Sequence, residues 1–141
     1  FSFICSDMSQ VAKYTNPLSK QSFKLMKHYL PGPYTFILEA NNSVPKILKT
    51  KRKHVGIRIP DNNIILKIVE SLGAPILTTS LKNDDEILEY TSDPDLIYED
   101  FHKLVDMVVD GGPGDNIPST VVDCSGVEPE IIRQGKGDIV F

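Results

Sequence analysis

A short alternating segment near the middle of the chain carries a single arginine. In residues 54–60 the apolar side chains fall at positions 55, 57 and 59, and the positions between them hold Gly56, Arg58 and Pro60. A period of two predicts a β-strand with one apolar face. Pro60 ends this strand because proline has no backbone N–H for the ladder. Arg58 is therefore expected near the C-terminal end of the strand, on the less apolar face.

The chemistry of Arg58 points to an anion. Its guanidinium group is a planar fork that can hold a carboxylate or a phosphate in two parallel hydrogen bonds. The alternative is a salt bridge within the protein, because buried arginines usually find an internal partner. Asp61 and Asp138 are the candidate acids for Arg58 and for Arg133, an arginine near the end of the chain. The sequence leaves both interpretations open.

Strands and helices are predicted to alternate along the rest of the chain. Apolar and β-branched runs favour strands, whereas capping residues followed by apolar spacings of three and four favour helices. Asn16 and Asp61 are the predicted caps of the helices that follow them. Short connections suit hairpins and long ones suit crossovers, so we predict an α/β fold with helices flanking a twisted, open mixed sheet. The expected strands, besides 54–60, are residues 1–5, 34–38, 75–80, 107–109, 120–124 and 131–133, and the expected helical segments are 8–14, 16–30, 44–48, 61–72 and 93–105.

Length and composition are those of an ordinary globular domain. The chain has 141 residues, of which 40% are hydrophobic and 24% charged, so we expect one domain over residues 1–141. The first residue is Phe1 rather than Met, and the opening residues already have the pattern of a strand. The sequence is therefore expected to be a piece of a longer protein.

The two cysteines and the short apolar runs argue against a metal-binding protein and against a membrane protein. Cys5 and Cys124 lack the spacing of metal ligands, so we predict no metal site and reduced, packed thiols, as in cytoplasmic proteins. No apolar run approaches the roughly 20 residues of a membrane helix, and no signal-peptide pattern opens the chain.

Charge is unevenly distributed. A net charge of -4 argues against a protein that coats nucleic acid over its whole surface. Residues 46–58 nevertheless hold six cations, while residues 84–110 are strongly acidic. The basic edge could contact RNA phosphates, or it could be a solvated loop that only aids solubility. The residues predicted to bind RNA are Lys49, Lys51, Arg52 and Lys53.

Five segments in order resemble one known family. They are Pro31-Gly32-Pro33-Tyr34-Thr35, Gly56-Ile57-Arg58-Ile59-Pro60, Thr79-Ser80, Ser119-Thr120-Val121-Val122-Asp123 and Arg133-Gln134-Gly135-Lys136-Gly137. Together they resemble the YrdC/YciO family, which includes threonylcarbamoyl-AMP synthase. The resemblance implies a twisted α/β sheet with a concave, basic cleft. It also implies a nucleotidyltransferase that condenses L-threonine, bicarbonate and ATP with Mg²⁺ into threonylcarbamoyl-adenylate for tRNA modification.

The resemblance also implies roles for individual residues. Arg58 would meet the threonine carboxylate with Ser119 beside it, and these two are the expected catalytic residues. Thr79, Ser80 and Arg133 would line the nucleotide side of the cleft, with Thr35 near it. No residue here needs to act as a nucleophile, because the chemistry depends on positioning and on stabilising phosphate charge.

Two departures from the family pattern matter. The synthases continue the Thr-Ser pair with Ala-Asn, whereas here Leu81 follows Ser80, which is nearer to the YciO branch. The family's N-terminal part, with its Lys-x-Arg motif, is expected to precede Phe1, so this piece alone is expected to be inactive. The alternative function is a non-catalytic protein that binds double-stranded RNA or tRNA. A missing strand would also leave a sheet edge through which two copies could pair as a homodimer.

Overall fold

The computed structural model describes residues 1–51, 53–81 and 92–141. Contacts within the chain define two compact units, one formed by Phe1–Thr79 with Ser119–Phe141 and the other by Ser80–Pro118. The first unit contains all six strands, and the expectation of one domain over the whole chain stays a prediction.

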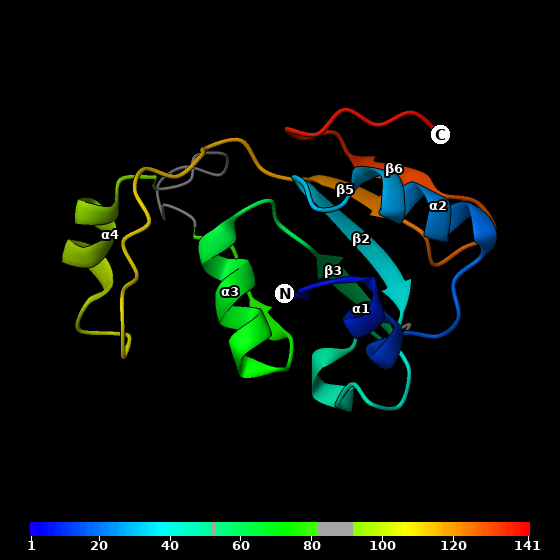
Figure 1. The fold of residues 1–141 in the computed structure, drawn as a ribbon, viewed down its shortest axis with the longest axis horizontal. Helices are drawn as coiled ribbons and strands as arrows, with labels where there is room; N and C mark the ends of the chain where they lie inside the picture. The colour runs from blue at the N-terminus through cyan, green and yellow to red at the C-terminus, as the bar shows by residue number, and fades with distance from the viewer. Residues whose placement is uncertain (52, 82–91) are drawn as a thin grey trace. The chain divides into compact units, whose positions relative to one another are not determined.

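The first unit is built on a six-stranded mixed sheet (Figure 1). The strand order is β4-β1-β3-β2-β5-β6. β1 pairs parallel with β3 and β2 pairs parallel with β5, while the other neighbours are antiparallel. The predicted mixed sheet is therefore confirmed. The strands are β1 (Ser2–Ile4), β2 (Tyr34–Glu39), β3 (His54–Arg58), β4 (Ile76–Thr78), β5 (Thr120–Asp123) and β6 (Glu130–Arg133).

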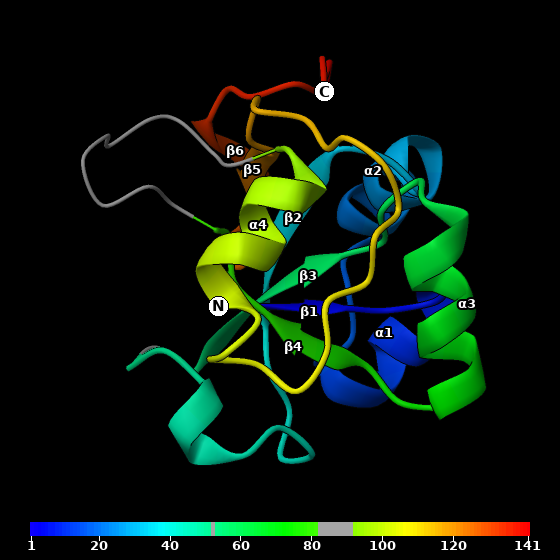
Figure 2. The same cartoon turned by 90° about the vertical axis from the view of Figure 1, so that its left-hand side faces the viewer.

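One face of this sheet is covered by two helices, α1 (Met8–Tyr14) and α2 (Lys20–Tyr29), as Figures 1 and 2 show. Phe36 of β2 and Ile57 of β3 are fully buried in the same apolar cluster as Met26 of α2. The alternation read from β3 is confirmed, since Val55 and Ile57 are buried and the residues between them are half-buried. The helices thus pack against one face of the sheet, and Arg58 lies on the other face.

Two helix starts differ from the prediction. Helix α2 begins at Lys20, because the side chain of Ser19 accepts a hydrogen bond from the Ser22 amide. Asn16 instead donates its backbone N–H to Glu39 at 2.9 Å, which ties the connection to β2. Helix α3 (Asn63–Leu72) is capped by Asn62 rather than Asp61.

The second unit contains helix α4 (Pro94–Phe101), whose N-terminus is capped by the predicted Asp93. The helix ends four residues before the predicted 105. The strand predicted at 107–109 is wrong, because these residues are not in a strand. Met107 is 77% exposed and Val109 is 56% exposed. An apolar run by itself does not make a strand when no neighbouring strand completes the hydrogen bonds.

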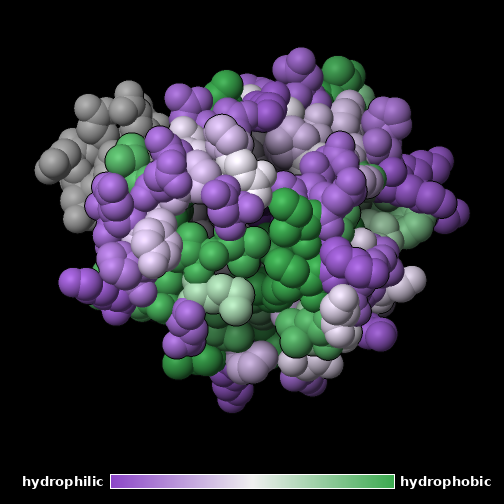
Figure 3. Space-filling model, turned by 60° about the vertical axis from the view of Figure 1, so that its left-hand side comes forward, coloured by the Kyte–Doolittle hydropathy of each residue, from purple (hydrophilic) through white to green (hydrophobic). Residues whose placement is uncertain are grey.

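Helix α3 keeps apolar side chains at the surface. Ile64, Ile68 and Leu72 are spaced four residues apart, and between 39% and 61% of each side chain is exposed. Figure 3 shows apolar surface gathered at the centre of one face of the molecule, with polar side chains around it.

None of the helices in the described part of the chain has the length and hydrophobicity needed to cross a membrane.

Gly137 is expected to tolerate no side chain. A Cβ atom there would lie 2.5 Å from ring atoms of Tyr34, whose hydroxyl donates to the Asp138 carbonyl. Gly137→Ala should lower the free energy of unfolding by about 1–3 kcal/mol, as overpacking usually does. Gly126→Ala is the matched control, because nothing lies within 4 Å of its added Cβ. Urea unfolding measures both, and equal stability of the two variants would contradict the close packing.

Stability is expected to fall at high pH because of Cys5. Both cysteines are free, and burial raises the pKa of Cys5 to about 12, with a smaller effect from the charge of Asp7. An unfolded thiol ionises near pH ~8.5, so between about pH 9 and 12 the unfolded chain binds fewer protons than the folded one. Each pH unit in this window should cost on the order of 1 kcal/mol. Urea unfolding from pH 8.5 upward should show a shallower loss for Cys5→Ala than for the natural chain, and parallel losses would refute this.

Candidate functional site

Strand pairing brings four predicted residues to one end of the sheet. Arg58 and Arg133 are the last residues of β3 and β6, whereas Thr35 lies at the start of β2 and Ser119 directly precedes β5. Because β2 runs opposite to β3, and β5 runs opposite to β6, strand starts and strand ends meet there. Thr35 is paired with Val121, which is paired with Arg133. These positions therefore share one row across the sheet. Phe36 is paired with Ile57 in the antiparallel pair of β2 and β3, so Thr35 lies opposite Arg58 and the row extends to Arg58.

Ser119 is at the centre of this group. Its hydroxyl and that of Thr35 are 2.8 Å apart and share a hydrogen bond. Arg133 donates to the Ser119 carbonyl from Nε at 3.1 Å and from Nη2 at 2.8 Å, and Nη2 also donates to the Ser119 hydroxyl at 3.3 Å. The guanidinium group of Arg133 is thus fixed beside two hydroxyl groups.

Arg58 is the unsatisfied member of the group. Its Nε is buried and has no hydrogen-bond partner among the described residues. Burial lowers the pKa of the Arg58 guanidinium, and the positive charge of Arg133 lowers it further. Leaving a buried donor unpaired is costly, and two nearby cations repel each other. An anion held at this place would relieve both effects.

The alternative of an internal salt bridge finds no support in the described part of the chain. The charged residue that shifts the pKa of Arg58 is another cation rather than an acid, and the side chain of Arg133 bonds to Ser119. Asp138 takes part through its backbone carbonyl, which accepts from the Tyr34 hydroxyl. Asp61 is exposed.

The close neighbours of Gly56, next to Arg58, were not predicted from the sequence. Gly56 lies two residues before Arg58 on the same face of β3, and a Cβ atom there would be 3.4 Å from side-chain carbons of both Ser2 and Thr35. The Ser2 hydroxyl is 3.1 Å from that of Thr78. Alternation places Gly56 on this face, but only the pairing of β1 with β3 and β4 reveals the two hydroxyls beside it.

Thr79 and Ser80 are placed differently from the other candidates. β4 is antiparallel to β1, so Ile76 pairs with Ile4 in the row of Arg58 while Thr78 pairs with Ser2. Thr79 follows Thr78 and is exposed, at the end of β4 that is farther from this row. Ser80 is the first residue of the second unit. Nucleotide contacts by Thr79 and Ser80 stay predictions.

Three of the residues predicted to bind RNA, Lys49, Lys51 and Lys53, lie before the start of β3. Lys49 and Lys53 line a cavity of about 520 Å³ together with Lys46. Lys51 is exposed, and Arg52 lies outside the described residues. RNA binding by these side chains stays a prediction. Within the described ranges, no three His, Cys, Asp or Glu side chains gather as metal ligands.

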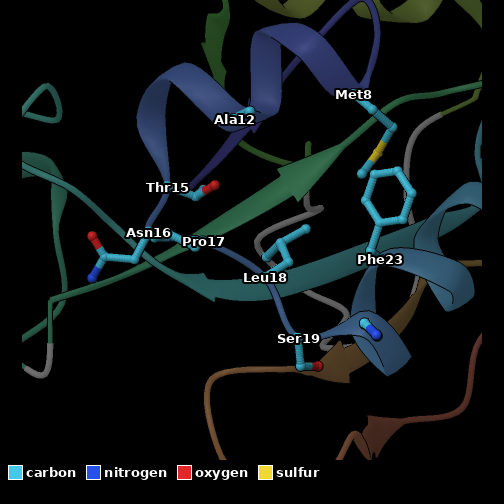
Figure 4. A pocket seen from close by; sticks show the side chains of 9 residues that line it. Met8, Ala12, Thr15, Asn16, Pro17, Leu18, Ser19 and Phe23 are labelled. Atoms are coloured by element: carbon cyan, nitrogen blue, oxygen red, sulfur yellow. The ribbon is translucent and has the colours of Figure 1, made fainter.

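A third concave region, between α1 and α2, lacks the chemistry of the Arg58 group. This cavity of about 460 Å³ is mainly apolar, and Figure 4 shows the side chains of Met8 and Phe23 meeting at one side of it near Leu18. Lys20 supplies its one charged lining residue. The Arg58 end of the sheet therefore suits an anion better than this apolar cavity does.

Comparisons with known proteins identify close relatives of YciO type. The chain is 40% identical over 138 residues to an uncharacterised protein of Haemophilus influenzae, and it covers 66% of that protein's length. It is 39% identical over 141 residues to the uncharacterised protein YciO of Escherichia coli and covers 67% of it. The crystal structure of E. coli YciO superposes with a TM-score of 0.91, with 98% of this chain and 66% of YciO covered. This sequence thus spans about two thirds of these relatives.

More distant relatives are named as enzymes. The threonylcarbamoyl-AMP synthase of Pyrococcus abyssi is 25% identical over 131 residues, which are 92% of this chain and 38% of the synthase. The crystal structure of P. abyssi Sua5 complexed with L-threonine superposes with a TM-score of 0.83, and 95% of this chain and 40% of Sua5 are covered. Residues 1–135 match the family Sua5_yciO_yrdC, described as "Telomere recombination". The chain belongs to the Sua5/YciO/YrdC family.

Proposed function

We propose that the Arg58 end of the sheet binds the anionic groups of an amino acid and a nucleotide in the synthesis of an acyl-adenylate. The observation that carries this proposal is the buried Nε of Arg58, which has no hydrogen-bond partner in residues 1–51, 53–81 and 92–141, and whose pKa is lowered by the nearby charge of Arg133. A protein that keeps this arrangement without a ligand accepts a cost in stability. A bound carboxylate or phosphate would supply the missing hydrogen bond and the opposite charge.

The proposed substrates are L-threonine, bicarbonate and ATP with Mg²⁺. Arg58 holds the threonine carboxylate, with the hydroxyl of Ser119 beside it. Arg133, anchored on Ser119, faces the nucleotide phosphates, and Thr35 orients the Ser119 hydroxyl through their shared hydrogen bond. Gly56 adds no side chain to this face of β3, where Ser2 and Thr35 lie on either side of it. Support for threonine comes from the Sua5 relative complexed with L-threonine.

The reaction needs positioning and charge stabilisation rather than a protein nucleophile. The threonine amine and bicarbonate form a carbamate and release water, and a carbamate oxygen then bonds to the α-phosphorus of ATP while the α–β bond breaks and pyrophosphate leaves. Arginine forks stabilise charge on phosphate oxygens. Mg²⁺ would arrive bound to the ATP phosphates, because this ion keeps several of its waters and is commonly bound through substrate phosphates.

A second candidate function is binding without turnover. Leu81 stands where the synthases have the alanine of Thr-Ser-Ala-Asn, and the relatives with about 40% identity are uncharacterised. In this case the protein binds a nucleotide or RNA and releases no pyrophosphate. The lysine-lined cavity at the start of β3 favours an RNA contact.

Replacing Arg58 is expected to weaken ligand binding without lowering the Tm of the ligand-free protein. Removing one partner of a buried ion pair usually destabilises a protein by about 3–5 kcal/mol. Arg58→Met should instead leave the Tm of the ligand-free protein unchanged or slightly higher, because an unpaired donor and a repulsion are removed. L-Threonine should raise the Tm of the natural protein and of the exposed control Lys24→Met, but not that of Arg58→Met. A fall in the ligand-free Tm of Arg58→Met by about 10 °C or more would show a structural salt bridge instead.

Threonine-dependent release of pyrophosphate tests the proposed reaction. The complete protein that contains this sequence should release pyrophosphate from ATP when threonine and bicarbonate are both present. Arg58→Met should lower kcat/KM for threonine by roughly tenfold to a hundredfold, the value of a hydrogen bond to a charged group. Lys24→Met should leave the rate unchanged. Nucleotide binding without any release would instead favour the second candidate function.

A further inference from the structure

The cavity at the start of β3 is a separate, strongly cationic site. Three lysines line it, and the rest of the lining is polar apart from one alanine. The lining contains no carboxylate. The complete set is Asn16, Ala40, Asn41, Asn42, Lys46, Lys49, Thr50 and Lys53.

The backbone that carries the lysines is anchored. Val44 is almost fully buried, and Leu48, in the 3₁₀ turn η1 (Lys46–Leu48), packs against the main apolar cluster. A turn then brings the Lys53 amide to the Thr50 carbonyl at 2.9 Å, and Lys53 adopts a left-handed φ of 61°. The Lys53 carbonyl in turn accepts from the Ala40 amide at 2.8 Å. These contacts hold the segment in place, unlike a freely solvated loop.

The amide side of the cavity is equally fixed. The side-chain nitrogen of Asn41 donates to the carbonyls of Lys13 at 2.9 Å and Thr15 at 3.4 Å, and its oxygen accepts from the Ser43 amide at 2.8 Å. Asn16 donates to the Glu39 carboxylate at 3.4 Å, at the edge of the cavity. Glu39 is thus hydrogen-bonded to one lining residue, while three lysines belong to the lining itself. The site keeps an excess of positive charge.

We propose that this cavity binds a phosphoryl group, either as free phosphate or as a phosphate of an RNA backbone. Lysine is a common phosphate ligand because its compact charge carries three donors. A phosphoryl group offers several acceptor oxygens and up to two negative charges, which suits three cations better than a carboxylate does. Lys53 directly precedes β3 and Arg58 ends it, so the strand separates them by roughly 17 Å. The cavity is therefore distinct from the Arg58 site; its RNA ligand rests on the second candidate function, whereas its free phosphate ligand does not depend on either proposed function.

The test is an NMR titration of the complete protein with sodium phosphate and, separately, with an RNA duplex of about 12 base pairs. The variants are K46Q/K49Q/K53Q and a control, K24Q/K67Q/K103Q, which removes the same charge from exposed positions elsewhere. Phosphate or RNA should shift the amide signals of residues 46, 49 and 53. The cavity variant should bind at least roughly tenfold more weakly, and the slope of log affinity against log salt for RNA should fall by about 2–3. The control should keep the affinity of the natural protein.

Each outcome decides the proposal. Shifts with phosphate identify a free phosphoryl ligand, and shifts with RNA alone identify a backbone phosphate, and both support it. No shift at residues 46, 49 and 53 with either probe overturns it, as does an equal loss in the control variant. Arg58→Met should retain these shifts, so failure at the Arg58 site and failure at this cavity are distinguishable.

Discussion

The pairing of β2 with β3 on one side and β5 on the other is the constraint on which the structure depends. β2 is antiparallel to β3 and parallel to β5, so the start of β2 meets the end of β3. Apolar residues of all three strands, such as Phe36, Ile57 and Val122, are fully buried beneath the helices. A shift by one residue would turn these side chains to the other face. The same register therefore secures the core and sets the place of Arg58.

On the face of the sheet opposite this core, Arg58 and Arg133 are near enough for their positive charges to repel each other. Arg133 donates a hydrogen bond to Ser119. The charged form of Arg58 is instead disfavoured by its burial and by the positive charge of Arg133, and both lower its pKa. Functional sites often contain groups that are unfavourable in the free protein and become satisfied when ligand binds. Membership of the Sua5/YciO/YrdC family is consistent with this view. The departure at Leu81 and the uncharacterised YciO-type relatives leave the reaction itself a proposal.

The two cationic sites lie at opposite ends of β3 and differ in kind. The Arg58 site is partly buried and combines arginine forks with hydroxyl groups, which suits oriented recognition of a small substrate. The lysine-lined cavity at the start of β3 is more exposed and combines compact charges with amides, which suits a phosphoryl group whose orientation matters less. A single short strand thus separates two groups of cations with different surroundings.

The sequence alone determined the alternating fold class, most element positions, and the face of β3 that carries Arg58, because side-chain alternation is a local property of the chain. It also identified Thr35, Ser119 and Arg133, through motifs that resemble a family. It misplaced the starts of α2 and α3, whose caps are Ser19 instead of Asn16 and Asn62 instead of Asp61. It also predicted a strand at 107–109, where the structure has none. Only the tertiary structure decided that the buried Nε of Arg58 has no hydrogen-bond partner in the described part of the chain, and that Ser2 and Thr78 lie beside Gly56, because these facts depend on which strands become neighbours.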